Sequence, residues 1–590
     1  MSSAADLRSD FDLGPRILPM AALAALIGFL ATLGAWALMA MIRFFTNLFY
    51  FQTFSLAANS PANNHLGLWA IGVPAVGGLI VGLIARFGTD KIRGHGIPEA
   101  IEAILFGQSK LSPKVAVLKP ISAGITIGSG GPFGAEGPVI MTGGAIGSLL
   151  GQLLHLSAAE RKAFLVAGAA AGMTAVFGTP LAAVLLAVEV LLFELRPRSL
   201  VPVAIACTVA GFARPLFMDS GPLFALQTAP LGYWTLISCL IAGVLSALLG
   251  GVLSRSLYAV EDFFARLPIH WMWWPALGGI VVGIGGYFEP RTLGVGYDVI
   301  NGLLHNQYAP AVVLSIVLIK TVIWLVALGS LTSGGVLAPV LTIGAGLGVL
   351  LGVVLGAWFP GHDAALWPLL CMAGVLGGVL HAPLMAAFFA FGITGDVNAL
   401  LPLLGTTMVS YAGMVLLMPR SILTEKIARR GLHVWRETGV DPLERYTAQE
   451  WMSKQLETLP AALSVAQALA GPFGAGQKHR AYPVLDGERF VGIVDRQLLL
   501  LAEPGDTCAQ VLEKVEPSLR QAHALPQETC RTVATRMARL EVDRLPVLAE
   551  ANSTQLLGLI SRSDLIKPAL EHYREEEVRE RPGILGSKDA

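Results

Sequence analysis

Long apolar runs, broken at short intervals by glycine and proline, constrain this chain more than any other feature. They recur from Ile17 to about Met418, whereas the sequence from Arg420 onward carries regularly spaced charges. An apolar helix of about 20 residues can cross the roughly 30 Å of hydrocarbon in a bilayer. Only 14% of all residues are charged, against about a quarter in typical soluble proteins. The sequence therefore predicts a polytopic membrane domain followed by a soluble tail.

The predicted domain boundaries follow this division. We expect an N-terminal segment at 1–16, a membrane domain at 17–430, a linker at 431–446, tail modules at 447–505 and 506–572, and a charged tail at 573–590. The run Ile17–Ile42 is too long for a signal-peptide core and has no evident cleavage site, so we interpret it as a membrane helix. The five cysteines show no ligand or disulfide spacing. A net charge of zero gives no reason to expect a nucleic-acid partner.

Several of the apolar segments are too short to span a bilayer. They lie at about 17–42, 67–86, 162–178, 180–195, 201–217, 233–257, 272–287, 311–328, 337–357, 364–380 and 401–418. Short segments broken by glycine and proline are typical of helices that end within the membrane and face a protein-lined cavity.

Two stretches of this region resemble two later stretches in the same order. Gly137–Gly147 (GPVIMTGGAIG) resembles Ala338–Gly348 (APVLTIGAGLG), and Thr179–Ala183 (TPLAA) resembles Ala382–Ala386 (APLMA). The offsets between the matching prolines are 201 and 203 residues. Chance similarity between Gly/Ala-rich helices is the alternative. Two related halves would place a transport site at their interface, near the midplane.

Three glycine-rich loops end in a proline that is suited to open a helix, at Gly94–Pro98, Gly134–Pro138 and Gly334–Pro339. Proline fits the first helical turn, and glycine permits a sharp turn and the close approach of a ligand. Each helix start offers free N–H groups and about half a positive charge. Several such starts at one spot would bind an anion without a full lysine or arginine charge.

Glu136 is the only charged residue between Gly128 and Gly151, a stretch with nine glycines. A carboxylate at membrane depth is a functional hypothesis by default. A static acid that interacts with the helix dipole is the alternative. Because a carboxylate on an anion-binding helix start competes with the anion, we expect Glu136 to gate the site.

The motifs GHGIPE (94–99), GPFGAEGP (131–138), GGVLAP (334–339) and FGTPLAAVLLAVE (177–189) resemble those of the CLC chloride channel and transporter family. The resemblance covers roughly residues 17–430. It implies an all-α polytopic membrane protein with two inverted-topology repeats of tilted and broken helices. It also implies a homodimer in which each subunit has its own anion pathway.

The resemblance assigns roles to individual residues. It makes Glu136 the gating glutamate, and it makes Val336 and Leu337 donors of backbone amides to the central anion. The expected anion-binding residues are His95, Gly96, Ile97, Pro98, Gly335, Val336, Leu337, Ala338 and Leu423.

The chain departs from the family pattern at two of these positions. His95 replaces a serine whose hydroxyl contacts the anion. A neutral imidazole can donate one hydrogen bond and a protonated one adds charge, or the ring points elsewhere and the backbone suffices. Leu423 replaces a tyrosine at the inner gate, so we expect that gate to be wider or apolar.

A third departure concerns proton coupling. Family exchangers carry a proton-relay glutamate where this chain has Val190, next to Glu189. A Glu-Val pair resembles the passive channels of the family. Glu189 and Glu194 are the candidate relays, and Glu194 would serve if the helix were shifted. The alternative, which we favour, is that Glu194 is a salt-bridging residue at a helix end.

The tail resembles a pair of CBS domains at roughly 447–572, and a paired α/β module is expected there. Gly558–Asp564 (GLISRSD) fits the pattern in which an aspartate contacts the ribose of an adenine nucleotide and hydroxyls contact its phosphate. Ser561, Ser563 and Asp564 are therefore candidate nucleotide ligands. Gly492–Gln497 in the first module lacks this arrangement. A purely structural or dimerising tail is the alternative.

The sequence thus predicts chloride transport across the cytoplasmic membrane, passive and gated by Glu136, with the CBS tail in the cytoplasm. Proton-coupled chloride antiport is the alternative within the family. A CBS-bearing divalent-cation transporter would need several carboxylates at membrane depth, and the glycine-rich loops supply essentially one. No nucleophile–base or metal-ligand set marks an enzyme, and no cofactor is expected besides an adenine nucleotide on the tail.

Overall fold

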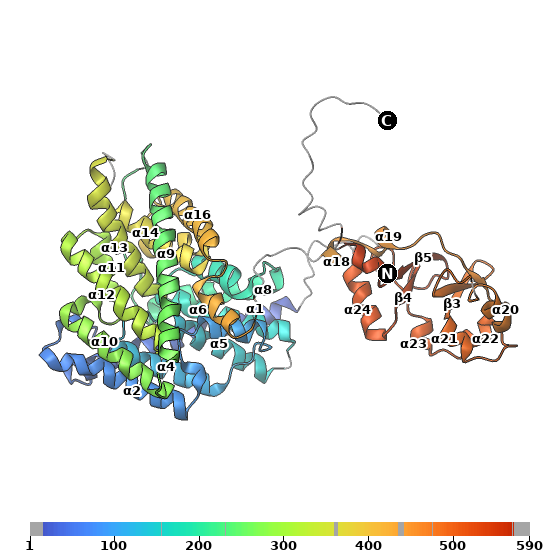
Figure 1. Cartoon of the computed structure of the whole chain (residues 1–590), viewed down its shortest axis with the longest axis horizontal. Coiled ribbons are helices and arrows are strands. Elements are labelled where there is room, and N and C mark those ends of the chain that lie inside the picture. The colour runs from blue at the N-terminus through green and yellow to red at the C-terminus, as the bar shows by residue number, and fades with distance from the viewer. Residues whose placement is uncertain are drawn as a thin grey trace. The chain divides into compact units, whose positions relative to one another are not determined.

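The computed structural model describes residues 16–568 and 570, except 155, 231, 359–363, 433, 435–441 and 475. The chain divides into two compact units, Asp10–Thr438 and Gly439–Ala590. The first unit is helical and the second contains both helices and strands (Figure 1). Residues 1–15 of the predicted segment 1–16, part of the linker 431–446 and the charged tail 573–590 lie outside the described residues.

The first unit consists of two halves with the same order of helices, followed by α17 (Ile422–Arg429). The first half contains α1 (Ile17–Phe51), α2 (Gly72–Phe87), α3 (Ile97–Leu105), α4 (Pro113–Gly128), α5 (Glu136–Leu153), α6 (Ala158–Phe177), α7 (Pro180–Leu186, continued by a π-helix at Ala187–Leu192) and α8 (Pro197–Ala213). The second half contains α9 (Thr235–Ala265), α10 (Trp274–Phe288), α11 (Tyr297–Leu304), α12 (Pro310–Gly329), α13 (Leu337–Leu355), α14 (Leu366–Leu380), α15 (Pro383–Thr394) and α16 (Leu400–Leu417).

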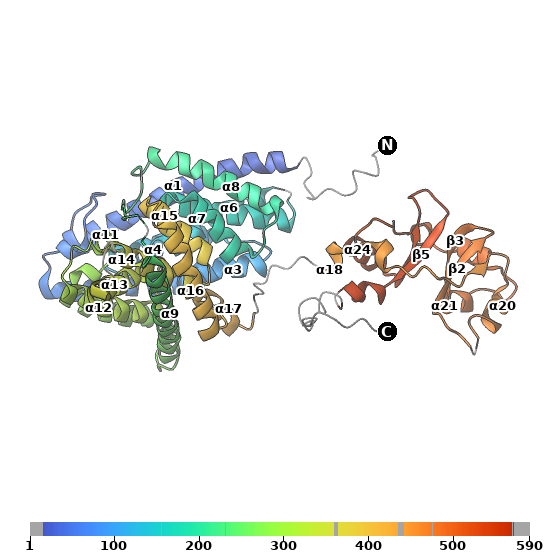
Figure 2. The same ribbon diagram turned by 90° about the horizontal axis from the view of Figure 1, so that it is seen from above.

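The halves are related by reciprocal contacts, as inverted-topology repeats require. In the first half, α1 packs along α6 and α8 (Figure 2). In the second, α9 packs along α14 and α16. At the seam between halves, α2 packs on α10 through glycines. A Cβ on Gly78 would lie 2.2 Å from the carbonyl oxygen of Pro275, and one on Gly279 would lie 2.3 Å from that of Pro74. The predicted repeats are therefore present.

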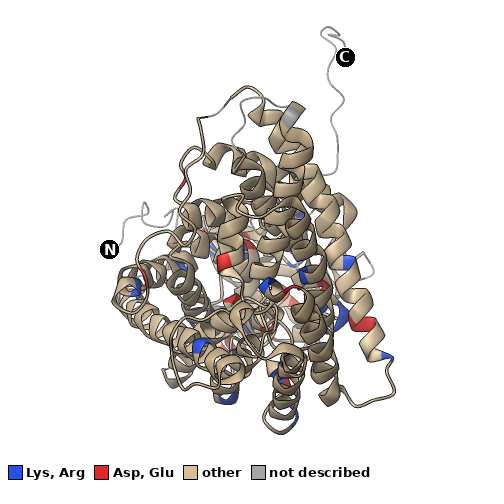
Figure 3. Ribbon diagram, turned by 90° about the vertical axis from the view of Figure 1, so that its left-hand side faces the viewer, with Lys and Arg blue, Asp and Glu red and all other residues tan. Residues whose placement is uncertain are grey.

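The apolar helices fall into two classes. Seven described helical segments are long and apolar enough to span a membrane, and charged residues are sparse on the helices (Figure 3). By contrast, α14 is buried along its whole length and α6 is buried from Ala163 to Phe177. A helix that is apolar all round belongs in the interior of a protein or membrane. Helices α6 and α14 therefore form the centre of the unit, around which the broken helices are arranged.

The segments predicted from hydropathy differ from the structure in some of their bounds, and they omit the short helices α3, α11 and α15 as well as α4 and α5. The first helix ends at Phe51 and not near Ile42. Helices α4 and α5 were not among the predicted apolar segments, because α4 contains Lys119 and Pro120 and α5 is rich in glycine. Both helices are largely enclosed by protein, so they need no continuous lipid-facing apolar surface.

The tail unit contains two similar modules, each with an antiparallel hairpin that leads into a helical turn. The first has the sheet order β1-β2-β3, with β1 (Leu459–Pro460) parallel to β2 (Ala481–Asp486) and β2 antiparallel to β3 (Arg489–Asp495). The second pairs β4 (Arg544–Leu548) with β5 (Leu556–Ser561). The helices are α18 (Pro442–Arg445), α19 (Ala448–Trp451), α20 (Val465–Ala470), α21 (Arg496–Leu500), α22 (Cys508–Glu513), α23 (Pro517–Arg520) and α24 (Cys530–Leu540).

The two tail modules exchange their leading segments. Cys508 and Leu512, at the start of the predicted second module (506–572), pack in the core of the first. Ala448 and Met452, at the start of the predicted first module (447–505), pack in the core of the second. Because each core needs a segment from the other side, the two modules form one folding unit.

The glycine contacts between α2 and α10 should matter for the stability of the membrane unit. Gly78→Ala should destabilise the membrane unit by about 1–3 kcal/mol, because the new methyl group would overlap the Pro275 carbonyl. Gly72→Ala, on the same helix with nothing within 4 Å of its Cβ, should leave stability unchanged. Thermal unfolding of the detergent-solubilised protein measures both. Equal melting temperatures for the two variants would contradict the glycine seam.

Candidate functional site

Three of the predicted helix starts meet at one place in the membrane unit. A Cβ on Gly137 would lie 1.9 Å from the carbonyl oxygen of His95 and 3.5 Å from the Cα of Gly335. The N–H of Gly335 donates a 3.0 Å hydrogen bond to the carbonyl oxygen of Gly134. The starts of α3, α5 and α13 are therefore in direct backbone contact, which only glycine at these positions permits.

The first turns of these helices are buried, and their N-cap residues supply no capping side chain. Gly96 and Val336 are the N-cap residues of α3 and α13, and neither supplies a capping side chain. His95, Ile97, Pro98, Val336, Leu337 and Ala338 are all buried. The N–H groups of an uncapped first turn have no intrahelical acceptor. A small anion is the ligand that such a cluster of helix starts accepts.

Glu136 is the first residue of α5 and is fully buried. A Cβ on Gly134 would lie 1.8 Å from Glu136 Oε2, and one on Gly335 would lie 2.5 Å from it. The carboxylate thus fits between two glycines. It faces the backbone N–H groups of Glu136 and Ala338 without reaching a hydrogen bond of normal geometry to any described residue. It occupies the surface that a bound anion would use.

His95 lies beside the same cluster, at the start of α3. Its ring is buried, and Nδ1 has no hydrogen-bond partner among the described residues. The charges of Lys426, Glu99 and Lys119 act on the ring. A buried imidazole with an unused nitrogen is suited to donate a hydrogen bond to a bound anion in the appropriate tautomer.

An ion-pair cluster anchors the start of α3 to α17. Glu99 accepts a 3.0 Å hydrogen bond from the N–H of Gly96. Its Oε1 lies 2.9 Å from Arg430 Nη2 and 3.8 Å from Lys426 Nζ. The same carboxylate therefore caps the helix and ties it to the segment that leads to the tail.

Two buried lysines hold the loops that precede α3 and α11. Lys119 Nζ donates to the carbonyl oxygens of Ile92 and Gly94 at 2.7 Å each. In the other half, Lys320 Nζ donates to those of Thr292 and Gly294 at 2.9 and 3.0 Å. Neither residue was predicted from the sequence. The signal that would have found them is a lysine at repeat-related positions of two apolar helices, 201 residues apart.

A cavity of about 570 Å³ opens beside the start of α3. It is lined by six cations and four carboxylates: Lys91, Arg93, Lys110, Lys426, Arg429 and Arg430, with Asp90, Glu99, Glu102 and Glu261. Met141 also lines it, and a Cβ on Gly96 would lie 2.9 Å from Met141 Cγ. The cavity therefore reaches the glycine loop of α3, and its excess of positive charge attracts anions.

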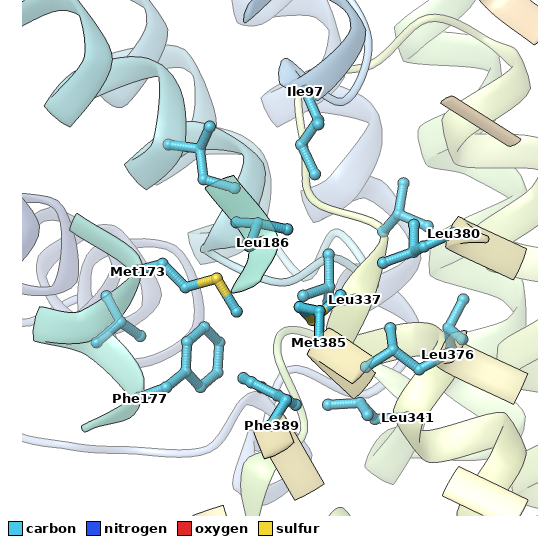
Figure 4. Close-up of a cluster of buried hydrophobic side chains, with 14 of the residues drawn as sticks. Ile97, Met173, Phe177, Leu186, Leu337, Leu341, Leu376, Leu380, Met385 and Phe389 are labelled. Carbon is cyan, nitrogen blue, oxygen red and sulfur yellow. The ribbon is translucent and has the colours of Figure 1, made fainter. Parts of the chain in front are cut away.

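Leu423 lies in α17 and is fully buried. It belongs to the apolar core that also contains Ile97 and Leu337. Figure 4 shows part of this core, in which Phe177 and Phe389 lie side by side near Leu337. The position expected to make the inner gate wider or apolar thus holds an apolar side chain in apolar surroundings.

The position of the family's relay glutamate holds Val190, and the two candidate relay acids both have partners in the structure. Val190 is fully buried in the π-helix. Glu189 accepts hydrogen bonds from the N–H groups of Leu384 (3.3 Å) and Met385 (2.8 Å), so it caps the start of α15. Glu194 accepts a 2.9 Å hydrogen bond from Ser199 Oγ and forms ion pairs with Lys162 and Arg196. These contacts agree with the structural interpretation of Glu194.

The predicted nucleotide ligands lie together at one edge of the tail unit. Asp564 accepts hydrogen bonds from the N–H and Oγ of Ser561, and it pairs with Lys567. Ser563 lies 2.8 Å from Ser561, oxygen to oxygen. All three line a cavity of about 730 Å³ together with basic residues: Lys478, His479, Arg480, Arg544 and Arg562. In the first module, Asp495 instead caps α21 through the N–H of Leu498.

Both units match known protein families. The chain matches the pattern described as voltage gated chloride channel over residues 77–414 and that of the CBS domain over residues 522–571. The voltage-gated ClC-type chloride channel ClcB of Salmonella dublin is 30% identical over 396 residues, 66% of this chain and 94% of that protein.

Two solved structures share the fold. The crystal structure of a slow cyanobacterial Cl⁻/H⁺ antiporter is similar with a TM-score of 0.63, at 22% identity, over 71% of this chain and 99% of the other. A eukaryotic CLC transporter is similar with a TM-score of 0.59, at 19% identity, over 93% of this chain and 98% of the other.

Proposed function

The chain belongs to the voltage gated chloride channel family, and we propose that it conducts chloride passively through a pathway that Glu136 gates. The observation that carries this proposal is a fully buried carboxylate, without an ion pair among the described residues, at the meeting point of three helix starts. The anion would bind the N–H groups at the starts of α3 and α13, with His95 as an additional donor.

Such a site attracts an anion without holding it tightly. The partial charges of helix starts are smaller than the charge of a lysine or arginine, and conduction requires that the ion also leaves. Lys119 of α4, which lies beside the α3 loop, donates to loop carbonyl oxygens. Its charge therefore raises the local potential while its hydrogen bonds are directed to the protein.

Gating follows because the Glu136 carboxylate and chloride compete for the same N–H groups. An ionised Glu136 places its carboxylate against the N–H of Ala338, where a chloride ion would otherwise bind. Protonation removes the charge and weakens this contact, and rotation of the side chain then frees the site. Flux should therefore rise as the pH falls.

The passive mode rests on the absence of a suitable relay. Antiport needs a second titratable group that exchanges protons with Glu136. Val190 cannot carry a proton. Glu189 accepts hydrogen bonds at the start of α15. Glu194 forms ion pairs with Lys162 and Arg196 and accepts a hydrogen bond from Ser199. The apolar Leu423 also removes a polar group that would help to close the inner side.

We also propose a homodimer in the cytoplasmic membrane, with the tail in the cytoplasm. Large apolar side chains of the first unit are exposed on α8 and α16, including Phe212 and Leu416. Lipid or a second subunit must cover them, and symmetric dimers are the commonest oligomers.

For the tail we propose weak binding of an adenine nucleotide. The 730 Å³ cavity combines two hydroxyls and a buried aspartate with an excess of basic side chains. Basic side chains are suited to phosphate, and Asp564 Oδ atoms are suited to ribose hydroxyls if its contact with Lys567 is exchanged.

The gating role of Glu136 predicts a change in pH dependence. Wild-type chloride flux into liposomes should rise with falling pH by up to about tenfold per unit, the most that one titrating group gives. Glu136→Gln and Glu136→Ala should give high flux that is independent of pH. His95→Ser is the control variant that removes the other titratable group beside the site. Unchanged pH dependence in the Glu136 variants would exclude the gate.

The passive mode predicts that a chloride gradient drives little or no uphill proton movement. The test records internal pH in liposomes while the chloride gradient is imposed. Robust proton pumping by the wild type that is lost in Glu194→Gln would make the protein an exchanger with a displaced relay. Loss of pumping in Glu189→Gln would assign that role to Glu189 instead.

The tail predicts modest ATP binding by the full chain in detergent, measured by calorimetry. Asp564→Ala should abolish the signal, because it removes the contact with Ser561 and the proposed ribose ligand. Asp486→Ala, an exposed aspartate in the hairpin of the first module, should bind as the wild type does. Absence of heat at millimolar ATP would leave the tail with a structural role.

A further inference from the structure

Tyr297 carries a polar group that its surroundings do not explain. Its hydroxyl is buried and has no hydrogen-bond partner among the described residues. The ring packs edge-on against Phe177 and Phe224, with centroids 6.1 and 6.0 Å away, and Phe177 in turn packs against Phe389 (Figure 4). A buried hydroxyl without a partner costs about 1–3 kcal/mol, so phenylalanine would fit this aromatic cluster better.

The repeat relates Tyr297 to the start of α3. Gly294 and Gly296 have positive φ values of 65° and 77°, as Gly94 and Gly96 have values of 76° and 88°. Lys320 holds the second loop as Lys119 holds the first. Tyr297 is thus the counterpart of Ile97 in the second half.

Tyr297 and Glu136 lie in neighbouring parts of the unit. The two are connected through α13: α11 packs against α13, and the loop before α13 contacts the Glu136 carboxylate. Other charges on these elements are directed elsewhere. Asp298 is exposed, and Lys320 is bound to loop carbonyl oxygens.

We propose that the Tyr297 hydroxyl is the hydrogen-bond donor that receives the Glu136 carboxylate when this side chain leaves the anion site. The inference rests on the proposed gate. Rotation about the side-chain bonds of Glu136 carries the carboxylate out of the space between Gly134 and Gly335. An ionised carboxylate in an aromatic cluster is costly without a donor, and a charge-assisted hydrogen bond from a phenol supplies one. Tyr297 thereby permits opening without protonation, and it acts as a positioning residue.

The test is chloride flux into liposomes near pH 4.5 and pH 7.5. Tyr297→Phe should lower flux about tenfold near pH 7.5, the effect of losing one charge-assisted hydrogen bond. Near pH 4.5, where Glu136 opens in its protonated form, the change should stay within about twofold. Tyr308→Phe, which alters a tyrosine that packs on Gly302 of the same helix, should match the wild type at both pH values.

A double variant distinguishes the proposed role of Tyr297, receiving the Glu136 carboxylate, from packing or direct anion contact. Glu136→Ala with Tyr297→Phe should conduct as Glu136→Ala alone does, because the side chain to be received is gone. An equal loss of flux in the Glu136→Ala background, or at both pH values, would overturn the proposal in favour of packing or direct anion contact. A Tyr297→Phe variant that equals the wild type would also overturn it. If Glu136→Ala kept the wild-type pH dependence, the gate itself would fail.

Discussion

The unsatisfied N–H groups at the starts of α3, α5 and α13 are the constraint on which the rest of the membrane unit depends. A helix start leaves N–H groups without intrahelical acceptors, and hydrocarbon supplies no water to satisfy them. These starts are buried, their N-cap side chains satisfy none of these groups, and Glu99 accepts only from the N–H of Gly96. The remaining N–H groups must therefore lie in protein and face a ligand. Backbone contact at Gly137 and Gly335 brings them together, and the broken helices follow from this requirement.

Charged side chains lie beside this cluster, but their hydrogen bonds and ion pairs are made with other protein groups. Lys119 and Lys320 donate to the carbonyl oxygens of the glycine loops, while Lys426 and Arg430 pair with Glu99. The loops are thereby fixed and the potential is made positive, but the ligand itself meets only dipoles. This arrangement reconciles attraction of an anion with its rapid release.

Much of the fold follows from local patterns. Apolar length indicated membrane helices, Gly-Pro loops indicated buried helix starts, and the paired proline motifs indicated two halves. Helices α4 and α5 were missed because their sequences carry Lys119 and many glycines instead of a continuous apolar run. Helices α6 and α14 are also enclosed by protein, but they were predicted because their sequences are apolar throughout the buried stretch.

The sequence by itself determined the membrane location, the repeat, and Glu136 as the lone charge in its glycine-rich stretch. Only the tertiary structure decided what the other acids do. Glu189 caps α15, nearly 200 residues later in the chain, and Glu194 pairs with Lys162 of another helix. The buried hydroxyl of Tyr297 is likewise evident only in three dimensions. Such roles depend on partners that are distant in sequence, and local periodicity and composition carry no information about which distant groups will meet.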